Sequence, residues 1–394
     1  MTGEFTADQL EVRAMARDFA AGEIRPYAPE WDAARELDPE VFHKLAELGF
    51  MGMRVPEAYG GLGFEASTYL LALEELAWGD AAVALSVAIH NGPVTALLLA
   101  HGTEDQRERY LPAMAAGDVL TAFALSERDA GSDAGGLACQ AVQDGDGWVL
   151  SGEKRWVTNG ARAGLVLVFA RTNPSAGRGH GIGVFLVDPS ADGYRVTGRE
   201  TTMGLCASET VSVRLDHVRV DADSVVGDPD EGFRYAMEAI DVGRLGIGAQ
   251  SVGIAQAAFE HSVAYALERK QFGRPIAEFG AIQGKVADMA TRIAGARALV
   301  HAGAAAMESG ACGSGADSRA ARAASAKLAG SETAFWVADE AVQIFGGYGY
   351  MRDYPVEKLL RDAKGTEIYE GASEILRLVI AREILNEAAK GHDN

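Results

Sequence analysis

A glutamate near the C-terminus is the residue of this chain best suited to act as a general base. Glu370 lies in the segment KGTEIYEGASEILRLVIAR, residues 364–382, between Tyr369 and Gly371. The apolar-periodic run that follows predicts a helix, with Ser373 as its expected N-cap. A carboxylate in such a turn is either a solvated loop charge or a base, and the segment alone leaves both interpretations open.

Three further segments place polar or planar side chains where a ligand could lie. The octapeptide SERDAGSD, residues 126–133, is either an ordinary turn or a loop whose glycine lets backbone N–H groups approach a ligand. In KRWVTNG, Trp156 and Thr158 share one face of a predicted strand, where the indole either fills the core or walls a flat ring. In ERKQFGRP, Arg269 lies in the predicted last turn of a helix, where it either complements the helix dipole or binds a phosphate.

Glycine is concentrated in two other helical regions. The segment QIFGGYGY, residues 343–350, follows a helix rather than a strand, so it is not a dinucleotide-binding fingerprint. Its glycines predict either a helix cap or close backbone approach to a ligand. The run AIDVGRLGIGAQSVGIAQAA, residues 239–258, indicates that another helix or a flat ligand packs close to it. Within that run Asp241 and Arg244, three residues apart, predict a surface ion pair.

The order of periodic patterns predicts three structural units. Residues 1–118 read as helices, and residues 228–394 read as long helical segments that predict a four-helix bundle. We expect the first of these long helices to run to Gly273. Between them, residues 119–227 hold short Val-rich runs separated by Gly, Asn and Asp turns. No long helix interrupts these runs, so we predict a compact antiparallel barrel or sandwich rather than a doubly wound parallel sheet.

Composition narrows the partners and the compartment. The chain has 394 residues and a formal net charge of −20, which disfavours nucleic acid and anionic membrane surfaces. Its three widely spaced cysteines predict reduced, buried thiols, and no metal site is predicted. The acidic N-terminus does not resemble a signal peptide, and we expect no run of about 18 uncharged apolar residues. These features together predict a cytoplasmic protein without membrane insertion.

The motifs in combination are more specific than any one of them. FALSERDAGSD, RWVTNG, ERKQFGRP, QIFGGYGY and IYEGASEILRLVIAR occur in the order and spacing of the acyl-CoA dehydrogenase family. LGFMGMRVPEAYGGLG and GTEDQRERYLPAMAAGD resemble the N-terminal helical domain of that family, so the resemblance covers nearly the whole chain. VAIHN and FAL are most similar to its short-chain and branched-chain members.

This resemblance implies a fold and a reaction. The implied fold is an α-helical domain, a β-domain and a four-helix bundle, assembled into a homotetramer that binds FAD. The implied reaction converts an acyl-CoA to a trans-2-enoyl-CoA in fatty acid β-oxidation and passes electrons to an electron-transfer flavoprotein. A base on one face of the acyl chain would take the α-proton, and the flavin on the other face would take the β-hydride.

The resemblance also implies roles for individual residues. Glu370 matches the catalytic base. Residues at the CoA and thioester parts of the substrate are Ser132, Asp241, Arg244 and Gly371. The implied FAD contacts are Phe123, Leu125, Ser126, Gly131, Ser132, Trp156, Thr158, Arg269, Phe272, Gln343, Gly346, Gly347, Ala372 and Glu374. Those from Arg269 to Gly347 would reach the FAD of a neighbouring subunit.

Some members of the family carry the base immediately before Arg244, where this chain has Gly243, so Glu370 has no rival. Four positions depart from the family pattern. Gly280 replaces a frequent Gln, Gly284 replaces a frequent aromatic residue, Ala372 replaces the usual Thr, and Cys206 stands where a basic residue is common. The alternative functions are an acyl-CoA oxidase, which is usually longer, a related flavoprotein acting on a non-fatty acyl-CoA, and a non-catalytic helical scaffold.

Overall fold

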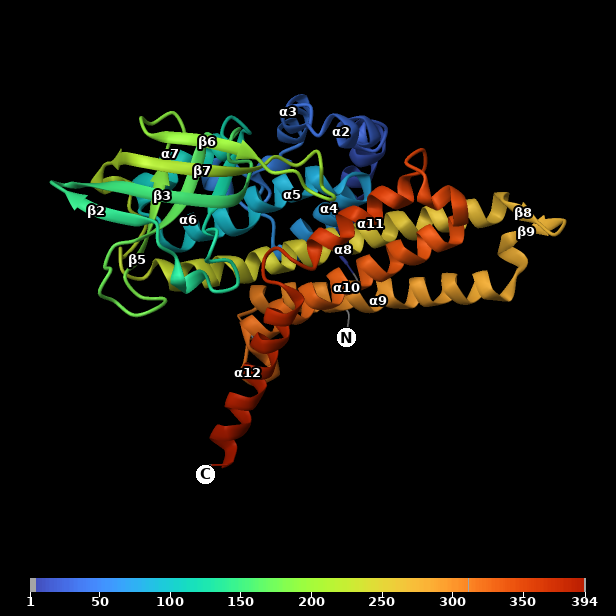
Figure 1. Ribbon diagram of the computed structural model, residues 1–394. Coiled ribbons are helices and arrows are strands. Elements are labelled where there is room, and N and C mark those ends of the chain that lie inside the picture. The colour runs from blue at the N-terminus through green and yellow to red at the C-terminus, as the bar shows by residue number, and fades with distance from the viewer. Residues whose placement is uncertain (1–4, 311, 393–394) are drawn as a thin grey trace.

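The chain folds as a helical unit, then a sheet, then a set of long helices (Figure 1), in the order that the sequence predicts. The computed structural model describes residues 5–310 and 312–392. The N-terminal helices are α1 (Ala7–Phe19), α2 (Ala28–Ala34), α3 (Glu40–Glu47), α4 (Ala66–Gly79), α5 (Ala81–Ile89), α6 (Thr95–His101) and α7 (Glu104–Ala115). A π-helical turn, η4 (His90–Val94), joins α5 to α6.

Side-chain caps explain where several of these helices begin. The Thr6 hydroxyl accepts a hydrogen bond from the Gln9 backbone N–H, and the Gln9 side-chain oxygen accepts one from the Thr6 backbone N–H. Thr103 and Gln106 form the same reciprocal capping box at α7. Asp80 caps α5 by accepting from two backbone N–H groups. Each cap satisfies donors that the first turn leaves unpaired.

One described helical segment contradicts our prediction that no long uncharged apolar run exists. Ala81–His101, which comprises α5, η4 and α6, is long and apolar enough by composition to cross a membrane, with a mean hydropathy of 1.6. However, 89% of its most apolar stretch is buried inside the protein. The N-terminal helices and the long helix α8 cover it, as expected for a core helix.

The middle unit is a curled seven-stranded sheet. Its strands are β1 (Thr121–Ala124), β2 (Gln140–Asp144), β3 (Gly147–Thr158), β4 (Leu165–Arg171), β5 (Ile182–Val187), β6 (Tyr194–Arg199) and β7 (Thr210–Val220), paired in the order β1-β4-β2-β3-β7-β6 with β5 on β4. Along β7, Val211, Val213 and Leu215 are buried in the alternating pattern typical of a half-buried strand. Most pairings are antiparallel, as predicted. The exceptions are β1 with β4, and a single contact between β2 and β4.

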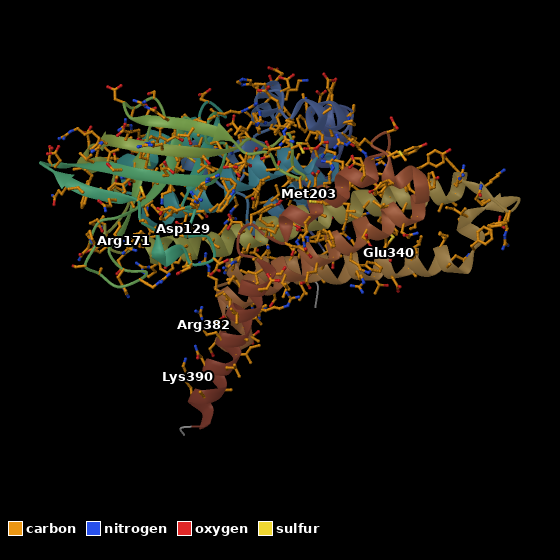
Figure 2. The ribbon with its side chains drawn as sticks, viewed as in Figure 1. Asp129, Arg171, Met203, Glu340, Arg382 and Lys390 are labelled. Atoms are coloured by element: carbon orange, nitrogen blue, oxygen red, sulfur yellow. The ribbon has the colours of Figure 1, made fainter. Side chains whose placement is uncertain are left out.

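The C-terminal helices are α8 (Gly232–Glu268), α9 (Gly280–Glu308), α10 (Arg319–Phe345), α11 (Pro355–Thr366) and α12 (Ser373–His392). α8, α9 and α10 pack side by side, α11 lies against α8 and α10, and α12 projects from the body (Figure 1). Figure 2 shows Arg382 and Lys390 on this projecting part. The short helix α11 was not predicted. The expected end of α8 at Gly273 is wrong, because the hairpin of β8 (Lys270–Gln271) and β9 (Arg274–Pro275) stops the helix at Glu268.

Glycines on α8 serve helix packing at two positions. A Cβ at Gly248 would come 2.9 Å from the Val300 side chain of α9. A Cβ at Gly253 would come 2.2 Å from the Glu74 backbone oxygen of α4. Neither position has room for a side chain, so these glycines let the helices approach closely. Gly243 and Gly246, nearer the start of α8, face a different environment.

Candidate active site

The loop between α11 and α12 presents Glu370 in a constrained backbone. Glu370 has φ 53° and Gly371 has φ 96°, both in the left-handed region that a glutamate seldom adopts. Two buried contacts hold the loop on either side of the glutamate. The Tyr369 hydroxyl lies 2.8 Å from Gln250 Oε1, and Lys327 Nζ donates to the Gly371 carbonyl oxygen at 2.8 Å. The strain is therefore held by contacts to α8 and α10.

The Glu370 carboxylate lies against Gly243 on α8. A Cβ at Gly243 would come 3.0 Å from Glu370 Oε2 and 3.3 Å from Oε1. The residue as a whole keeps partial exposure, yet Oε2 is buried and has no hydrogen-bond partner in the part of the chain that the structure describes. A buried carboxylate oxygen without a donor costs free energy, which a protein tolerates mainly at functional sites.

Burial raises the pKa of Glu370 to about 7, and the nearby cations Arg244 and Lys327 oppose part of that rise. A carboxylate with this pKa is a stronger base than one in water, yet a large fraction of it is ionised at neutral pH. The interpretation of Glu370 as a solvated loop charge is therefore wrong. The group is buried and more basic than a carboxylate in water, as suits a general base.

Lys327 is a site residue that the sequence interpretation missed. It is fully buried on α10, and burial lowers the pKa of its ammonium to about 8, while the field of Glu370 acts in the opposite direction. A signal for it was present in the sequence. Ala334, Val337, Ala338 and Ala341 form an apolar stripe on α10, and stepping back from Ala334 by three or four residues leads to Gly330 and then to Lys327. A single cation on a core-facing stripe indicates a specific partner.

Asp241 and Arg244 form a buried ion pair, so our prediction of a surface pair is wrong. Arg244 Nη1 lies 2.8 Å from Asp241 Oδ1, and the two side chains are 9% and 12% exposed. Arg244 Nε also donates a long hydrogen bond, 3.4 Å, to the Glu370 carbonyl oxygen. A spacing of three residues places both side chains on one face of the helix and is typical of surface ion pairs. The spacing does not show whether other helices cover that face.

A second group of candidates lies on the sheet. Trp156 is 52% exposed and has φ 57°, in a bulge of β3 opposite β7, so the alternative of a core tryptophan is wrong. A Cβ at Gly131 would come 4.0 Å from the Trp156 ring, which places the loop after β1 beside the indole. The other candidates of this group are Phe123, Leu125, Ser126, Ser132 and Thr158, of which Leu125 is buried and Ser132 exposed.

A buried ion pair anchors the loop after β1, and the sequence interpretation missed it as well. Lys154 is fully buried, and its Nζ donates to Glu127 Oε1 at 2.7 Å and to the Leu125 carbonyl oxygen at 3.0 Å. The Glu127 carboxylate also accepts from the backbone N–H groups of Ala138 and Cys139. These bonds tie both ends of the loop to β3, so its backbone is held in place beside Trp156.

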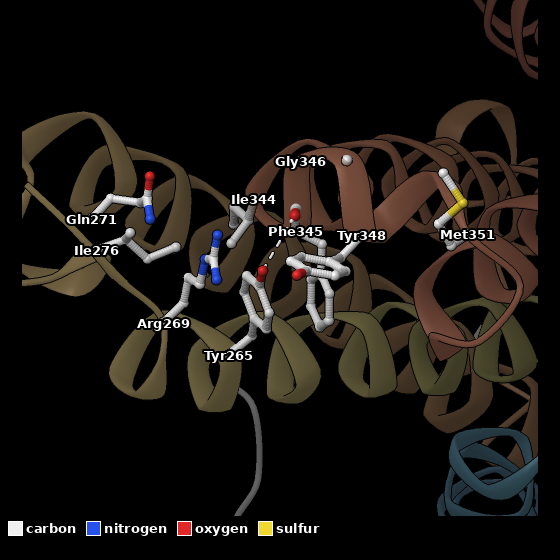
Figure 3. Close-up of a pocket in the computed structure, with 10 residues that line it drawn as sticks. Tyr265, Arg269, Gln271, Ile276, Ile344, Phe345, Gly346, Tyr348 and Met351 are labelled. Carbon is white, nitrogen blue, oxygen red and sulfur yellow. Dashed lines mark hydrogen bonds between the residues drawn. The ribbon is translucent and has the colours of Figure 1, made fainter.

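A third group of candidates lines a cavity of about 540 Å³ at the hairpin end of α8 (Figure 3). Arg269, Gly346 and Gly347 belong to the lining. A Cβ at either glycine would meet nothing within 4 Å, so both glycines border open space. Within the described part of the chain, no carboxylate pairs with the Arg269 guanidinium, which lies 5.2 Å from the Tyr348 ring. Gln343 and Phe272 are exposed nearby, Phe272 at 94%.

The cavity and Glu370 do not meet within one chain. Gly243, which touches Glu370, and Tyr265, which lines the cavity, are 22 residues apart on α8. At 1.5 Å per residue the separation along the helix is roughly 33 Å. The structure therefore brings Glu370 together with Asp241, Arg244 and Gly371. It holds the third group of candidates apart from them, namely Arg269, Phe272, Gln343, Gly346 and Gly347.

The start of α12 corrects one predicted cap. The Leu376 N–H donates to the Ala372 carbonyl oxygen, so Ala372 rather than Ser373 holds the N-cap position. Ser373 is the first helical residue, and its buried hydroxyl has no hydrogen-bond partner within residues 5–310 and 312–392. Glu374 is exposed in the first turn. The sequence favours Ser373 as the N-cap residue because an alanine side chain offers no oxygen that could accept a hydrogen bond.

Comparisons with known proteins agree with these observations along the whole chain. Residues 6–118, 122–218 and 230–385 match the N-terminal, middle and C-terminal domains of acyl-CoA dehydrogenase, respectively. An acyl-CoA dehydrogenase of Bacillus subtilis is 44% identical over 96% of this chain and 98% of its own length. The acryloyl-CoA reductase (NADH) of Anaerotignum propionicum is 41% identical over 98% of this chain and 96% of its own length. The butyryl-CoA dehydrogenase structure from Megasphaera elsdenii has a TM-score of 0.93 and 37% identity, covering 98% of this chain and 100% of its own.

Proposed function

Because this chain belongs to the FAD-dependent acyl-CoA dehydrogenase family, we propose that it oxidises an acyl-CoA thioester to the trans-2-enoyl-CoA, with Glu370 taking the α-proton. The observation that carries the proposal is the buried Oε2 of Glu370, to which no residue that the structure describes gives a hydrogen bond. Its raised pKa, about 7, narrows the gap between the base and a weakly acidic α-carbon.

The loop that carries the base also offers a donor for the thioester carbonyl. Among the described residues, none accepts a hydrogen bond from the backbone N–H of Glu370. We assign this N–H to the carbonyl oxygen, where negative charge develops as the α-proton leaves. Gly371 leaves space beside the thioester. Lys327 holds the Gly371 carbonyl and so keeps the strained loop in the conformation that aims the carboxylate.

The residues fit FAD at two places. The exposed Trp156 indole, with Thr158 two residues along the strand, offers a flat wall for the flavin ring. Arg269, Gly346 and Gly347 border an open cavity. None of the described carboxylates pairs with the guanidinium, and the two glycines leave space beside it, which suits a pyrophosphate. Bound FAD supplies the acceptor for the β-hydride of the substrate.

The separation of these two places supports assembly of several copies. Because the cavity lies roughly 33 Å along α8 from Gly243, we assign it to the FAD of a neighbouring copy in a homotetramer. We also propose that an electron-transfer flavoprotein is the electron acceptor and that the enzyme acts in the cytoplasm. The three cysteines, all free thiols, support that compartment.

The relative from Anaerotignum propionicum, named an acryloyl-CoA reductase, supports a second candidate direction. In the reverse reaction, protonated Glu370 would donate its proton to the α-carbon of an enoyl-CoA. A pKa of about 7 leaves the group partly protonated at neutral pH, so the same geometry serves either direction.

Anaerobic titration of the FAD-loaded protein with a panel of acyl-CoAs tests the proposal. We expect at least one saturated acyl-CoA to bleach the flavin absorbance and to yield its enoyl-CoA. If no saturated acyl-CoA bleaches the flavin, while an enoyl-CoA reoxidises the chemically reduced protein, the reductase direction replaces the dehydrogenase. If neither occurs, the proposed function is wrong.

A further inference from the structure

A buried tyrosine hydroxyl without a partner lies one helical turn away from the part of α8 that touches Glu370. Tyr69 on α4 is 1% exposed, and its Oη has no hydrogen-bond partner among the described residues. A Cβ at Gly246 would come 3.3 Å from this oxygen. Gly246 and Gly243 are three residues apart, so they share one face of α8. The glutamate carboxylate therefore lies over one glycine, and the tyrosine hydroxyl lies over the next.

A third glycine, Gly92, borders the space between the Tyr69 hydroxyl and Gly243. A Cβ at Gly92, in the π-helical turn η4, would come 3.7 Å from Tyr69 Oη and 4.0 Å from the Gly243 Cα. Apart from the hydroxyl, the surroundings of Gly246 are apolar, with Leu73 and Ala88 as its other near neighbours. Three positions without side chains thus separate two unpartnered polar atoms, the Glu370 carboxylate at one end and the Tyr69 hydroxyl at the other.

The hydroxyl is suited to donate a hydrogen bond. Burial raises the pKa of Tyr69 above its ordinary value, so the group stays protonated, and the positive charge of Arg54 acts in the opposite direction. A buried hydroxyl that leaves its donor unused costs free energy, whereas phenylalanine would fill the same volume without that cost. The hydroxyl therefore calls for a partner that arrives with a ligand.

Resting on the proposed function, we propose that Tyr69 is a specificity-determining residue that donates a hydrogen bond to an oxygen in the distal part of the acyl group. The preferred substrate class is then an acyl-CoA whose chain carries a hydrogen-bond acceptor beyond the β-carbon, rather than a plain alkyl chain. A site built to bond a substrate oxygen discriminates against the analogue that lacks it, because its own polar group is then left unpaired.

The test compares matched substrates in FAD-loaded wild type and Tyr69→Phe. The pairs are 4-methoxybutanoyl-CoA with hexanoyl-CoA, and 5-methoxypentanoyl-CoA with heptanoyl-CoA, so each ether oxygen replaces one methylene. The readout is the rate constant for anaerobic flavin reduction divided by the dissociation constant of the substrate. In wild type we expect a preference for the ether member of at least one pair, and a loss of about five- to tenfold of that preference in Tyr69→Phe. The variant should remain folded, because the removed hydroxyl bonds to nothing in the described chain.

Tyr110→Phe, at a half-buried tyrosine on α7, is the matched control and should leave both ratios unchanged. Equal ether preference in wild type and Tyr69→Phe for both pairs would overturn the assignment of Tyr69 and leave the proposed function standing. Failure of all four substrates to bleach the flavin in wild type would instead count against the proposed function, and the subsite would fall with it.

Discussion

Replacing Glu370 by Gln should stabilise the protein while it removes activity, and the gain should depend on pH. A carboxyl group whose pKa is higher in the folded than in the unfolded chain binds protons more tightly when folded. Its contribution to the free energy of unfolding therefore falls as the pH rises through the window from 4.5, the ordinary value, to about 7, the folded value. Glutamine has no such charge, so the variant escapes this loss.

The expected magnitude follows from the two pKa values. The ionisation of Glu370 costs about 1 kcal/mol of stability at pH 5 and about 3 kcal/mol at pH 8. The stability difference between Glu370→Gln and wild type should therefore grow by about 2–3 kcal/mol between these pH values. Any constant cost of burying the glutamine amide cancels in this comparison.

Urea denaturation at pH 5 and pH 8 measures this difference, at equal protein and FAD concentrations because ligand binding and assembly shift apparent stability. Glu30→Gln, which removes an exposed carboxylate on α2, is the control and should show the same small effect at both pH values. A stability difference for Glu370→Gln that does not change with pH would refute the argument that the carboxylate is buried without compensation.

Three other substitutions test the surroundings of the base. Lys327→Met should raise the pKa of Glu370 and move the acid limb of the kcat/KM–pH profile upward by about one pH unit. An unmoved limb would show that Lys327 has only a packing role. Lys327→Arg should retain the positive charge. Gly243→Ala would place a Cβ 3.0 Å from Glu370 Oε2 and should slow anaerobic flavin reduction at least about tenfold. Gly295→Ala, where a Cβ meets nothing within 4 Å, is its control, and equal rates in the two variants would contradict the contact. Ala372→Ser should supply the missing helix cap and raise the free energy of unfolding by about 1 kcal/mol in urea denaturation, and no gain would argue against Ala372 as the N-cap residue.

The three-unit fold was predictable because period and turn chemistry are local signals. Val211, Val213 and Leu215 alternate with polar residues in the sequence and are buried in the sheet, and Thr6, a residue type typical of helix caps, caps α1. Burial of charged groups was not predictable from local signals. The pair of Asp241 and Arg244 lies inside the protein only because other helices cover that face of α8.

The candidate base could be found from the sequence, but the features that support its chemistry could not. Glu370 stood out by its motif, whereas its strained backbone, its contact with Gly243 and its support by Lys327 depend on segments 43 or more residues away. Long-range packing of this kind leaves no periodic trace in the chain. The buried hydroxyl of Tyr69 belongs to the same class, since in the sequence it is one apolar-periodic residue of a helix among others.

Exchange of the substrate α-hydrogen with solvent tests the role of Glu370 most directly. FAD-loaded wild type and Glu370→Gln would each be incubated with a bound acyl-CoA in deuterium oxide, and mass spectrometry would follow deuterium entry at the α-carbon. We predict rapid exchange in wild type and a loss of several orders of magnitude in the variant, with flavin binding retained. Exchange at the wild-type rate in Glu370→Gln would contradict the assignment of Glu370 as the base.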